Sequence, residues 1–203
     1  MAKKRTNLAV VTKPILKLDI GCGKNKREGF RGVDQYVMDG VDDICDLRKT
    51  PWRFYPQGTE GAASYVLEPG SVEEVNCSHF LEHLTSTERV HFLNELYRVL
   101  MVGGKATVIT PHWASNRAYG DPTHQWPPVS EMFFYYLSKE WRATQAPHTD
   151  KKFNKDGYDC DFVATWGYSL NPAIQARNQE YQQFALQNHK EAAQDTIATL
   201  VKK

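Results

Sequence analysis

Short alternations of apolar and polar residues recur along the first half of the chain and predict β-strands. These alternations lie at residues 16–20, 32–34, 41–45, 72–77 and 106–110. Between the last two, apolar residues return at helical spacing over 90–100, which predicts an amphipathic helix. Thr85 or Ser86 can cap this helix, and Glu88 lies within reach of a capping box. Because strand and helix alternate in this order, we expect an α/β fold with a parallel, doubly wound sheet.

The second half of the chain carries fewer regular patterns. Residues 51–70 are rich in Gly, Pro and aromatic residues, so we expect a surface excursion there, with a short helix near 62–67. An aromatic helix is predicted over 130–141. A late strand is predicted over 161–170, with a partner strand near 141–145.

The C-terminal part of the chain predicts a long helix that has Pro172 in its first turn. The predicted fold is therefore Rossmann-like and doubly wound, with a mainly parallel sheet, a late antiparallel strand and a long C-terminal helix. It divides into a flexible basic arm at 1–13, one domain at 14–170 and a helical extension at 171–203. The extension is expected to lie on the domain or to reach a second copy of the chain, so a homo-oligomer is one expectation.

Composition and net charge limit the kinds of molecule that the protein is expected to bind. With 203 residues, 41% of them hydrophobic and 24% charged, the chain has the size and composition of one globular domain. Its net charge of +1 gives no overall electrostatic reason to expect nucleic acid or an anionic membrane. No apolar run is long enough to span a bilayer, and export is not expected. The four cysteines form no C-x-x-C pair, so we expect free thiols in a cytoplasmic protein.

A glycine-rich turn after the first predicted strand indicates a ligand site, a ligand-free loop being the alternative. Gly21 and Gly23 lack a Cβ, so the backbone can turn tightly and its N–H groups can contact a ligand. A dinucleotide fingerprint would need a third glycine where the chain has Lys26. A ligand with an adenosine end and an amino-acid end, such as S-adenosylmethionine, suits the turn better. Asp19 is then expected to face the ammonium group, and Asp34 to accept hydrogen bonds from the ribose.

Asp46 and Leu47 end the third predicted strand. The carboxylate can accept a hydrogen bond from an adenine amino group, while the leucine offers an apolar face to the ring. Such groups collect at the carboxyl edge of a parallel sheet. A helix-capping or loop role for Asp46 is the alternative.

Sequence motifs of the kind that protein families share occur in five segments of the chain, 18–26, 29–34, 41–47, 77–84 and 95–104. Together they resemble the class I S-adenosylmethionine-dependent methyltransferases, most closely a methyltransferase type 11-like subgroup with a short first loop. The resemblance covers about residues 15–125, and the chain departs from the broader family in lacking a full first helix. It implies S-adenosylmethionine as cofactor, bound by Asp19, Gly21, Cys22, Gly23, Lys24, Asp34, Asp46, Leu47, Ser78 and His79.

Methyl transfer to oxygen or nitrogen needs alignment of the reactants and a group that accepts a proton. His79 follows the fourth strand, and Asp121 and His124 follow the fifth, so these three are the catalytic candidates. No metal is expected. His79 and His83 have i, i+4 spacing, but neither a cysteine pair nor an H-E-x-x-H motif accompanies them.

The sequence therefore predicts a methyltransferase with an unidentified acceptor, which is a small molecule or a macromolecule. Methyltransferases that modify exocyclic amines of nucleic-acid bases resemble one another in an Asn/Asp-Pro-Pro-aromatic segment after the fourth strand. Residues 76–79 of this chain read Asn-Cys-Ser-His at that place, so methylation of exocyclic amines of DNA bases is disfavoured. The alternative from another class is a catalytically silent module that keeps the nucleoside-binding fold and uses its C-terminal helix to contact partners.

Overall fold

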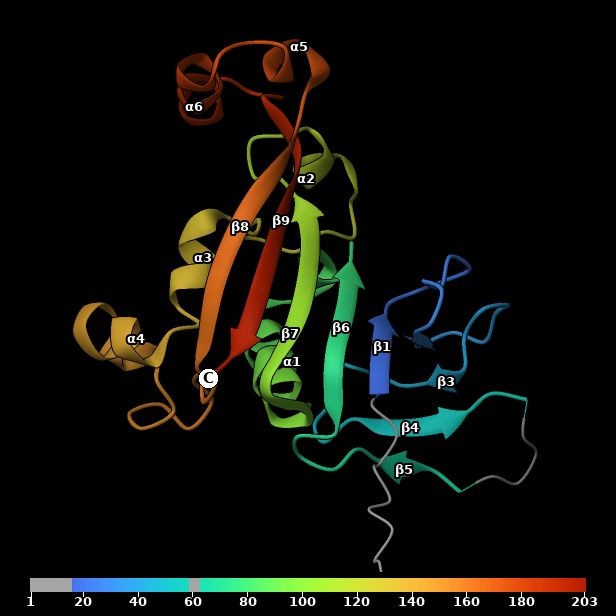
Figure 1. Cartoon of the computed structure of the whole chain (residues 1–203). Coiled ribbons are helices and arrows are strands. Elements are labelled where there is room, and N and C mark those ends of the chain that lie inside the picture. Colours follow the sequence, from blue (N-terminus) through green and yellow to red (C-terminus); the bar gives the residue numbers. More distant parts are fainter. Residues whose placement is uncertain (1–15, 59–62) are drawn as a thin grey trace, which may run out of the picture.

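The computed structural model describes residues 16–58 and 63–203, and its strands form one mixed sheet of nine strands. Their order across the sheet is β5-β4-β3-β2-β1-β6-β7-β9-β8 (Figure 1). The strands are β1 (Leu16–Ile20), β2 (Arg31–Asp34), β3 (Asp43–Ile44), β4 (Arg53–Pro56), β5 (Tyr65–Val66), β6 (Val72–Ser78), β7 (Leu100–Pro111), β8 (Phe162–Leu170) and β9 (Ala193–Lys202). The pairs β1–β2, β2–β3, β1–β6 and β6–β7 are parallel. The carboxyl ends of these strands therefore meet at one edge, where open α/β sheets bind ligands.

The connection from β1 to β2 is a loop of turns over residues 21–30 and contains no helix. Two carboxylates hold it. Arg27 N donates to Asp19 Oδ2 at 2.6 Å, and Lys26 Nζ donates to Asp42 Oδ2 at 2.9 Å. Asp42 Oδ2 also accepts from Gly32 N at 2.7 Å, so the same side chain fixes the loop and the start of β2.

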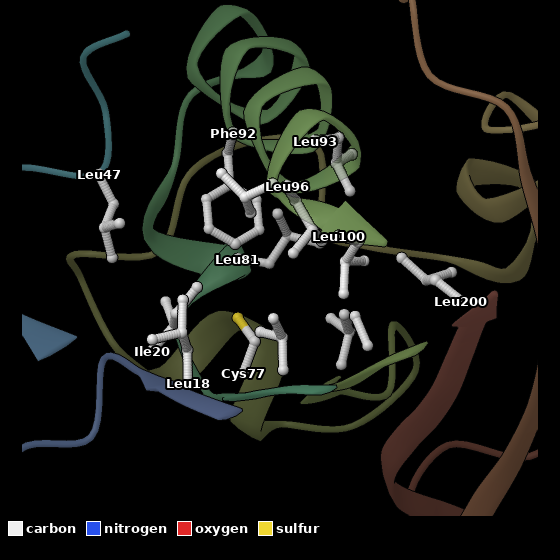
Figure 2. Packing of buried hydrophobic residues seen from close by; sticks show 14 of the residues in the cluster. Leu18, Ile20, Leu47, Cys77, Leu81, Phe92, Leu93, Leu96, Leu100 and Leu200 are labelled. Carbon is white, nitrogen blue, oxygen red and sulfur yellow. The ribbon is translucent and has the colours of Figure 1, made fainter. Parts of the chain in front are cut away.

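The helix α1 (Ser86–Val99) packs against one face of the sheet. The predicted capping box is confirmed, because Thr85 Oγ1 accepts from Glu88 N while Glu88 accepts from Thr85 N. Phe92 and Leu96 of α1 are fully buried, and Figure 2 shows them pointing into the core toward the strands. Burial of this apolar stripe joins α1 to the sheet.

Several short helices complete the fold. They are η1 (Leu81–His83), α2 (Arg117–Gly120), α3 (Glu131–Tyr135), α4 (Lys139–Gln145), η2 (Pro147–Thr149), α5 (Pro172–Gln175) and α6 (Gln179–Asn188). No helix among the described residues is both long and apolar enough to cross a membrane.

The prediction of a long C-terminal helix is wrong. Only α5 and α6 are helical there, and the chain ends in β9, which lies antiparallel between β7 and β8. Residues alternate along β9, with Thr196, Ala198 and Leu200 buried, which is the period of a strand. The expected late antiparallel strand is confirmed as β8, which pairs with β9. The pairing of β9 with β7 depends on contacts far apart in the sequence.

Three local predictions also need correction. The expected helix near 62–67 is wrong, because Tyr65–Val66 pairs with β4 as the edge strand β5. Residue 62 lies outside the described residues, as does the predicted arm at 1–13. The expected partner strand near 141–145 is helix α4, in which Ser138 Oγ accepts from Trp141 N as an N-cap. The predicted aromatic helix over 130–141 is divided between α3 and α4.

Truncation of Leu96 tests the packing of α1 on the sheet. Leu96 is fully buried, so Leu96→Ala is expected to lower the free energy of unfolding by about 2–5 kcal/mol. Val102→Ala removes methyl groups from a side chain that is 74% exposed, and should change it by less than about 0.5 kcal/mol. Urea unfolding measures both variants, and equal effects would contradict the packing described above.

Candidate functional site

A cavity of about 300 Å³ opens at the edge of the sheet where β1, β2, β3 and β6 end. It is lined by Gly21, Asp34, Gln35, Tyr36, Met38, Cys45, Asp46, Leu47, Arg48, His79, Phe80, His83 and Leu84. Most of these residues stand directly at, or just after, the carboxyl end of a strand. The volume lies at the lower end of the range for small-molecule sites. We call this space the edge cavity.

Gly21 forms the turn that the sequence predicted. Its φ of +65° lies in the left-handed region, which glycine adopts without strain, and its N–H donates to Val33 O of β2 at 2.8 Å. A Cβ at this position would lie 3.0 Å from Phe80 Cδ2. Because Phe80 also lines the edge cavity, the glycine preserves both the turn and the position of this ring.

Asp34 and Asp19 occupy different places. Asp34 lines the edge cavity, where its carboxylate accepts from Gly23 N and Tyr36 N, both at 3.1 Å. Asp19 is only 3% exposed and does not line the cavity. Its oxygens accept from Arg27 N at 2.6 Å and from Asn76 Nδ2 at 2.7 Å, so this carboxylate ties the first loop to β6.

Asp46 and Leu47 both line the edge cavity. Arg48 Nε donates to Asp46 Oδ1 at 2.8 Å, and this hydrogen bond lowers the pKa of Asp46 to about 2. The carboxylate is therefore ionised at neutral pH. A ligand amino group that bonds to Asp46 would share it with the guanidinium of Arg48.

The other predicted cofactor residues stand beside the cavity and do not line it. These are Cys22, Gly23, Lys24 and Ser78. The N–H of Gly23 donates to Asp34, so Gly23 helps to hold a carboxylate that lines the cavity. Burial raises the pKa of the Cys22 thiol to about 11, with Asp19 and Asp34 nearby adding to the shift.

Sequence reasoning missed several cavity residues. Gln35, Tyr36, Met38, Arg48, Phe80 and Leu84 line it and were not assigned. Tyr36 is 62% exposed and lies two residues after the end of β2, so the rule that ligands bind beyond the carboxyl ends of strands would have included it. Phe80 gave no such signal, because its role depends on its closeness to Gly21 in space.

A second, wider cavity of about 600 Å³ adjoins the edge cavity, and we call it the outer cavity. It is lined by His79, Glu82, His83, Pro111, Arg117, Gly120, Asp121, Pro122 and His124. His79 and His83 line both cavities. The structure therefore brings together all three predicted catalytic residues, His79, Asp121 and His124, around one space.

His79 occupies the junction of the two cavities in a left-handed backbone conformation, with φ +54°. A non-glycine residue in this region is strained, and such strain collects at functional sites. Its Nδ1 lies 3.2 Å from Glu82 Oε1, and this hydrogen bond raises the pKa of His79. Asp195 Oδ1 lies 3.9 Å from His79 Nε2 and is itself held by Arg117 Nη1 at 3.0 Å. The imidazole can therefore accept a proton between two carboxylates.

His124 and Asp121 belong to the loop after α2. His124 is mostly buried and its Nδ1 lies 3.2 Å from Ala118 O. Asp121 Oδ1 accepts from Thr123 N at 2.8 Å and from Thr123 Oγ1 at 2.7 Å. Asp121 Oδ2 lies 3.9 Å from His124 Nε2.

No protein-family model matches the chain, and no curated protein matches it significantly. Among solved structures it is similar to a SAM dependent methyltransferase from Archaeoglobus fulgidus, with 18% identity and a TM-score of 0.54, over 94% of this chain and 87% of that one. It is also similar to the 1,6-didemethyltoxoflavin-N1-methyltransferase of Burkholderia thailandensis, with 13% identity and a TM-score of 0.49, over 94% and 72% of the two chains. The first of these likenesses shows that the chain shares its fold with that methyltransferase.

The reactivity of Cys22 tests the geometry around the glycine turn. The other three cysteines are buried, and the raised pKa of about 11 leaves Cys22 almost wholly protonated at neutral pH. We expect its rate of reaction with a disulfide reagent to rise roughly a hundredfold from about pH 8 to about pH 10, since the thiolate fraction grows almost tenfold per pH unit. The urea-unfolded chain, with ordinary thiols, should show only a several-fold rise. A similarly small rise for the native chain would contradict the assigned surroundings of Cys22.

Proposed function

We propose that this chain is an S-adenosylmethionine-dependent methyltransferase that acts on an unidentified acceptor. The observation that carries the proposal is the edge cavity, which gathers Gly21, Asp34, Asp46 and Leu47 from three successive strand ends. These residue types suit the parts of a nucleoside, and they stand in the order in which the strands lie side by side. The finer membership in a type 11-like subgroup is also proposed, supported by the helix-free loop at 21–30.

The residues of the edge cavity divide the binding of such a cofactor between them. Asp34 has lone pairs left for the ribose hydroxyls beside its two backbone bonds. Asp46 offers an ionised acceptor to the adenine amino group, and Leu47 an apolar contact to the ring. Gly21 lets the backbone approach the amino-acid end of the ligand. Bound S-adenosylmethionine supplies a methyl group on a sulfonium, which is already a good electrophile.

His79 is proposed as the residue that accepts a proton from the acceptor. It lines both cavities, so a molecule in the outer cavity and a cofactor in the edge cavity would meet beside its ring. Glu82 Oε1 lies 3.2 Å from Nδ1 and orients the imidazole. The positive charge that His79 gains would be stabilised by Glu82 and Asp195.

Replacement of Gly21 tests the cofactor site. Gly21→Val places a β-branched side chain at φ +65° and against Phe80, so we expect roughly a hundredfold weaker binding of S-adenosylmethionine, about 3 kcal/mol. Isothermal titration with S-adenosylmethionine and S-adenosylhomocysteine measures this. Gly167→Val on β8 is the matched control, because a Cβ there would meet nothing within 4 Å. Failure of the folded wild-type chain to bind either compound would overturn the proposed function.

Replacement of His79 tests its catalytic role. His79→Asn keeps a residue that tolerates a left-handed backbone and can still donate to Glu82. We expect the rate of labelled methyl transfer to fractionated lysate, measured at saturating S-adenosylmethionine, to fall by roughly 10² to 10⁴. An unchanged rate would remove His79 from the reaction. Cofactor binding without any transfer by the wild-type chain would favour a catalytically silent module.

A further inference from the structure

Glu82, His83 and His124 form a cluster on the wall of the outer cavity. One possible ligand atom from each lies within 4.8 Å of those of the other two. Glu82 and His83 belong to η1, directly after β6, and His124 comes from the loop after α2. The cluster therefore exists only in the folded chain, where the two segments meet.

His124 presents a free lone pair at Nε2. Its Nδ1 lies 3.2 Å from the carbonyl oxygen of Ala118, and a carbonyl can only accept a hydrogen bond. In the neutral ring the proton must therefore be on Nδ1. Nε2 is then the unprotonated nitrogen, as in a metal-binding imidazole.

His83 has the same arrangement for a different reason. Its Nδ1 lies 3.0 Å from Thr123 Oγ1, and that hydroxyl donates its one proton to Asp121 Oδ1 at 2.7 Å. The hydroxyl can then only accept from His83, so Nδ1 carries the ring proton. The free lone pair of the neutral ring is again at Nε2.

Glu82 completes the set with a buried oxygen that has no partner. The residue is 4% exposed, and Oε1 lies 3.2 Å from His79 Nδ1. Oε2 is buried and makes no hydrogen bond to any residue in the described part of the chain. A buried acceptor without a donor is costly, and each one in a native structure calls for an explanation.

We propose that Glu82, His83 and His124 bind a divalent transition-metal ion at the junction of the two cavities. One ligand atom from each of the three residues lies within 4.8 Å of the others, and each residue has a lone pair that no hydrogen bond in the described part of the chain uses, so one cation can bind all three. Two imidazoles and one carboxylate are a common ligand set for Zn²⁺, Fe²⁺ and Co²⁺. The hydrogen bonds from both Nδ1 atoms supply the outer support that metal-binding histidines usually have.

The two segments that carry the ligands are fixed to each other independently of any ion. Gln125 N donates to Glu82 O at 2.8 Å. The buried guanidinium of Arg89 on α1 donates to Leu81 O at 3.1 Å and to Gln125 O at 3.1 Å. The ligand positions are therefore preorganised, which favours a specific ion over loose association.

The site also suggests a class of acceptor, and this step rests on the proposed function. The ion would lie beside His79 and open onto the outer cavity, which His83, Glu82 and His124 line. A divalent ion with three protein ligands has positions left for other ligands, and it binds and polarises oxygen. The acceptor is then a molecule that presents a hydroxyl group or an anionic oxygen to the ion.

Metal binding is tested directly with Co²⁺ as the probe. We expect the chelator-treated full-length chain to bind one Co²⁺ with visible d–d absorption, and Zn²⁺ to displace it. His124→Ala and His83→Ala should each weaken binding at least roughly a hundredfold, while His148→Ala, an exposed histidine on η2, should leave it unchanged. Thr123→Val keeps all three ligands but removes the acceptor at His83 Nδ1 and the donor to Asp121 Oδ1, so it should weaken binding roughly tenfold.

Two results would overturn the metal site. One is the absence of d–d absorption in the folded wild-type chain, and the other is equal Co²⁺ affinity in wild type and His124→Ala. The competing arrangement is a protonated His124 that pairs with Asp121, and it predicts both results. Titration of S-adenosylmethionine into the metal-free chain separates the two proposals, because cofactor binding without metal binding refutes only the metal site. Metal binding without cofactor binding refutes the proposed function and the acceptor class.

Discussion

The edge of the sheet that carries the edge cavity depends on the buried carboxylate of Asp19. The first connection of the sheet has no helix to cover it, so the loop at 21–30 must be held by side chains. Asp19 lies on β1 and accepts both from Arg27 N in that loop and from Asn76 Nδ2 on β6. Removal of this carboxylate would leave two donors without partners. The carboxylate thus joins three segments that surround the turn at Gly21.

Sequence patterns predicted those parts of the site that each stand at the end of a single strand. The glycine turn, Asp34 and the Asp46–Leu47 pair all stand directly at strand ends, and the parallel topology then requires them to meet. The helix α1 was predictable because its capping box and apolar stripe are local. The C-terminal strand was not, because β9 is specified by its pairing with β7 and β8, and its Gln- and Ala-rich approach favours helix.

Other parts of the site depend on contacts that no local pattern contains. The relative position of His83 and His124 depends on their hydrogen bonds to Thr123 and Ala118. It also depends on the carbonyl groups to which the Arg89 guanidinium donates. The net charge of +1 likewise does not show where the charges lie, because acidic residues that line or border the two cavities have basic partners nearby. Asp46 has Arg48 as its partner, and Asp195 has Arg117.

The turn from His79 to His83 links the two cavities physically. His79 N donates to Ile109 O of β7 at 2.8 Å, which holds the residue at the end of the sheet in spite of its left-handed backbone. Its side chain is fixed by Glu82, a residue that also lies close to His83 and His124 and whose second oxygen is buried. A change in the bonding of Glu82 therefore alters the imidazole that borders the edge cavity. One carboxylate, with Oε1 bonded to His79 and Oε2 buried without a partner in the described part of the chain, thus connects the groups of the outer cavity to His79.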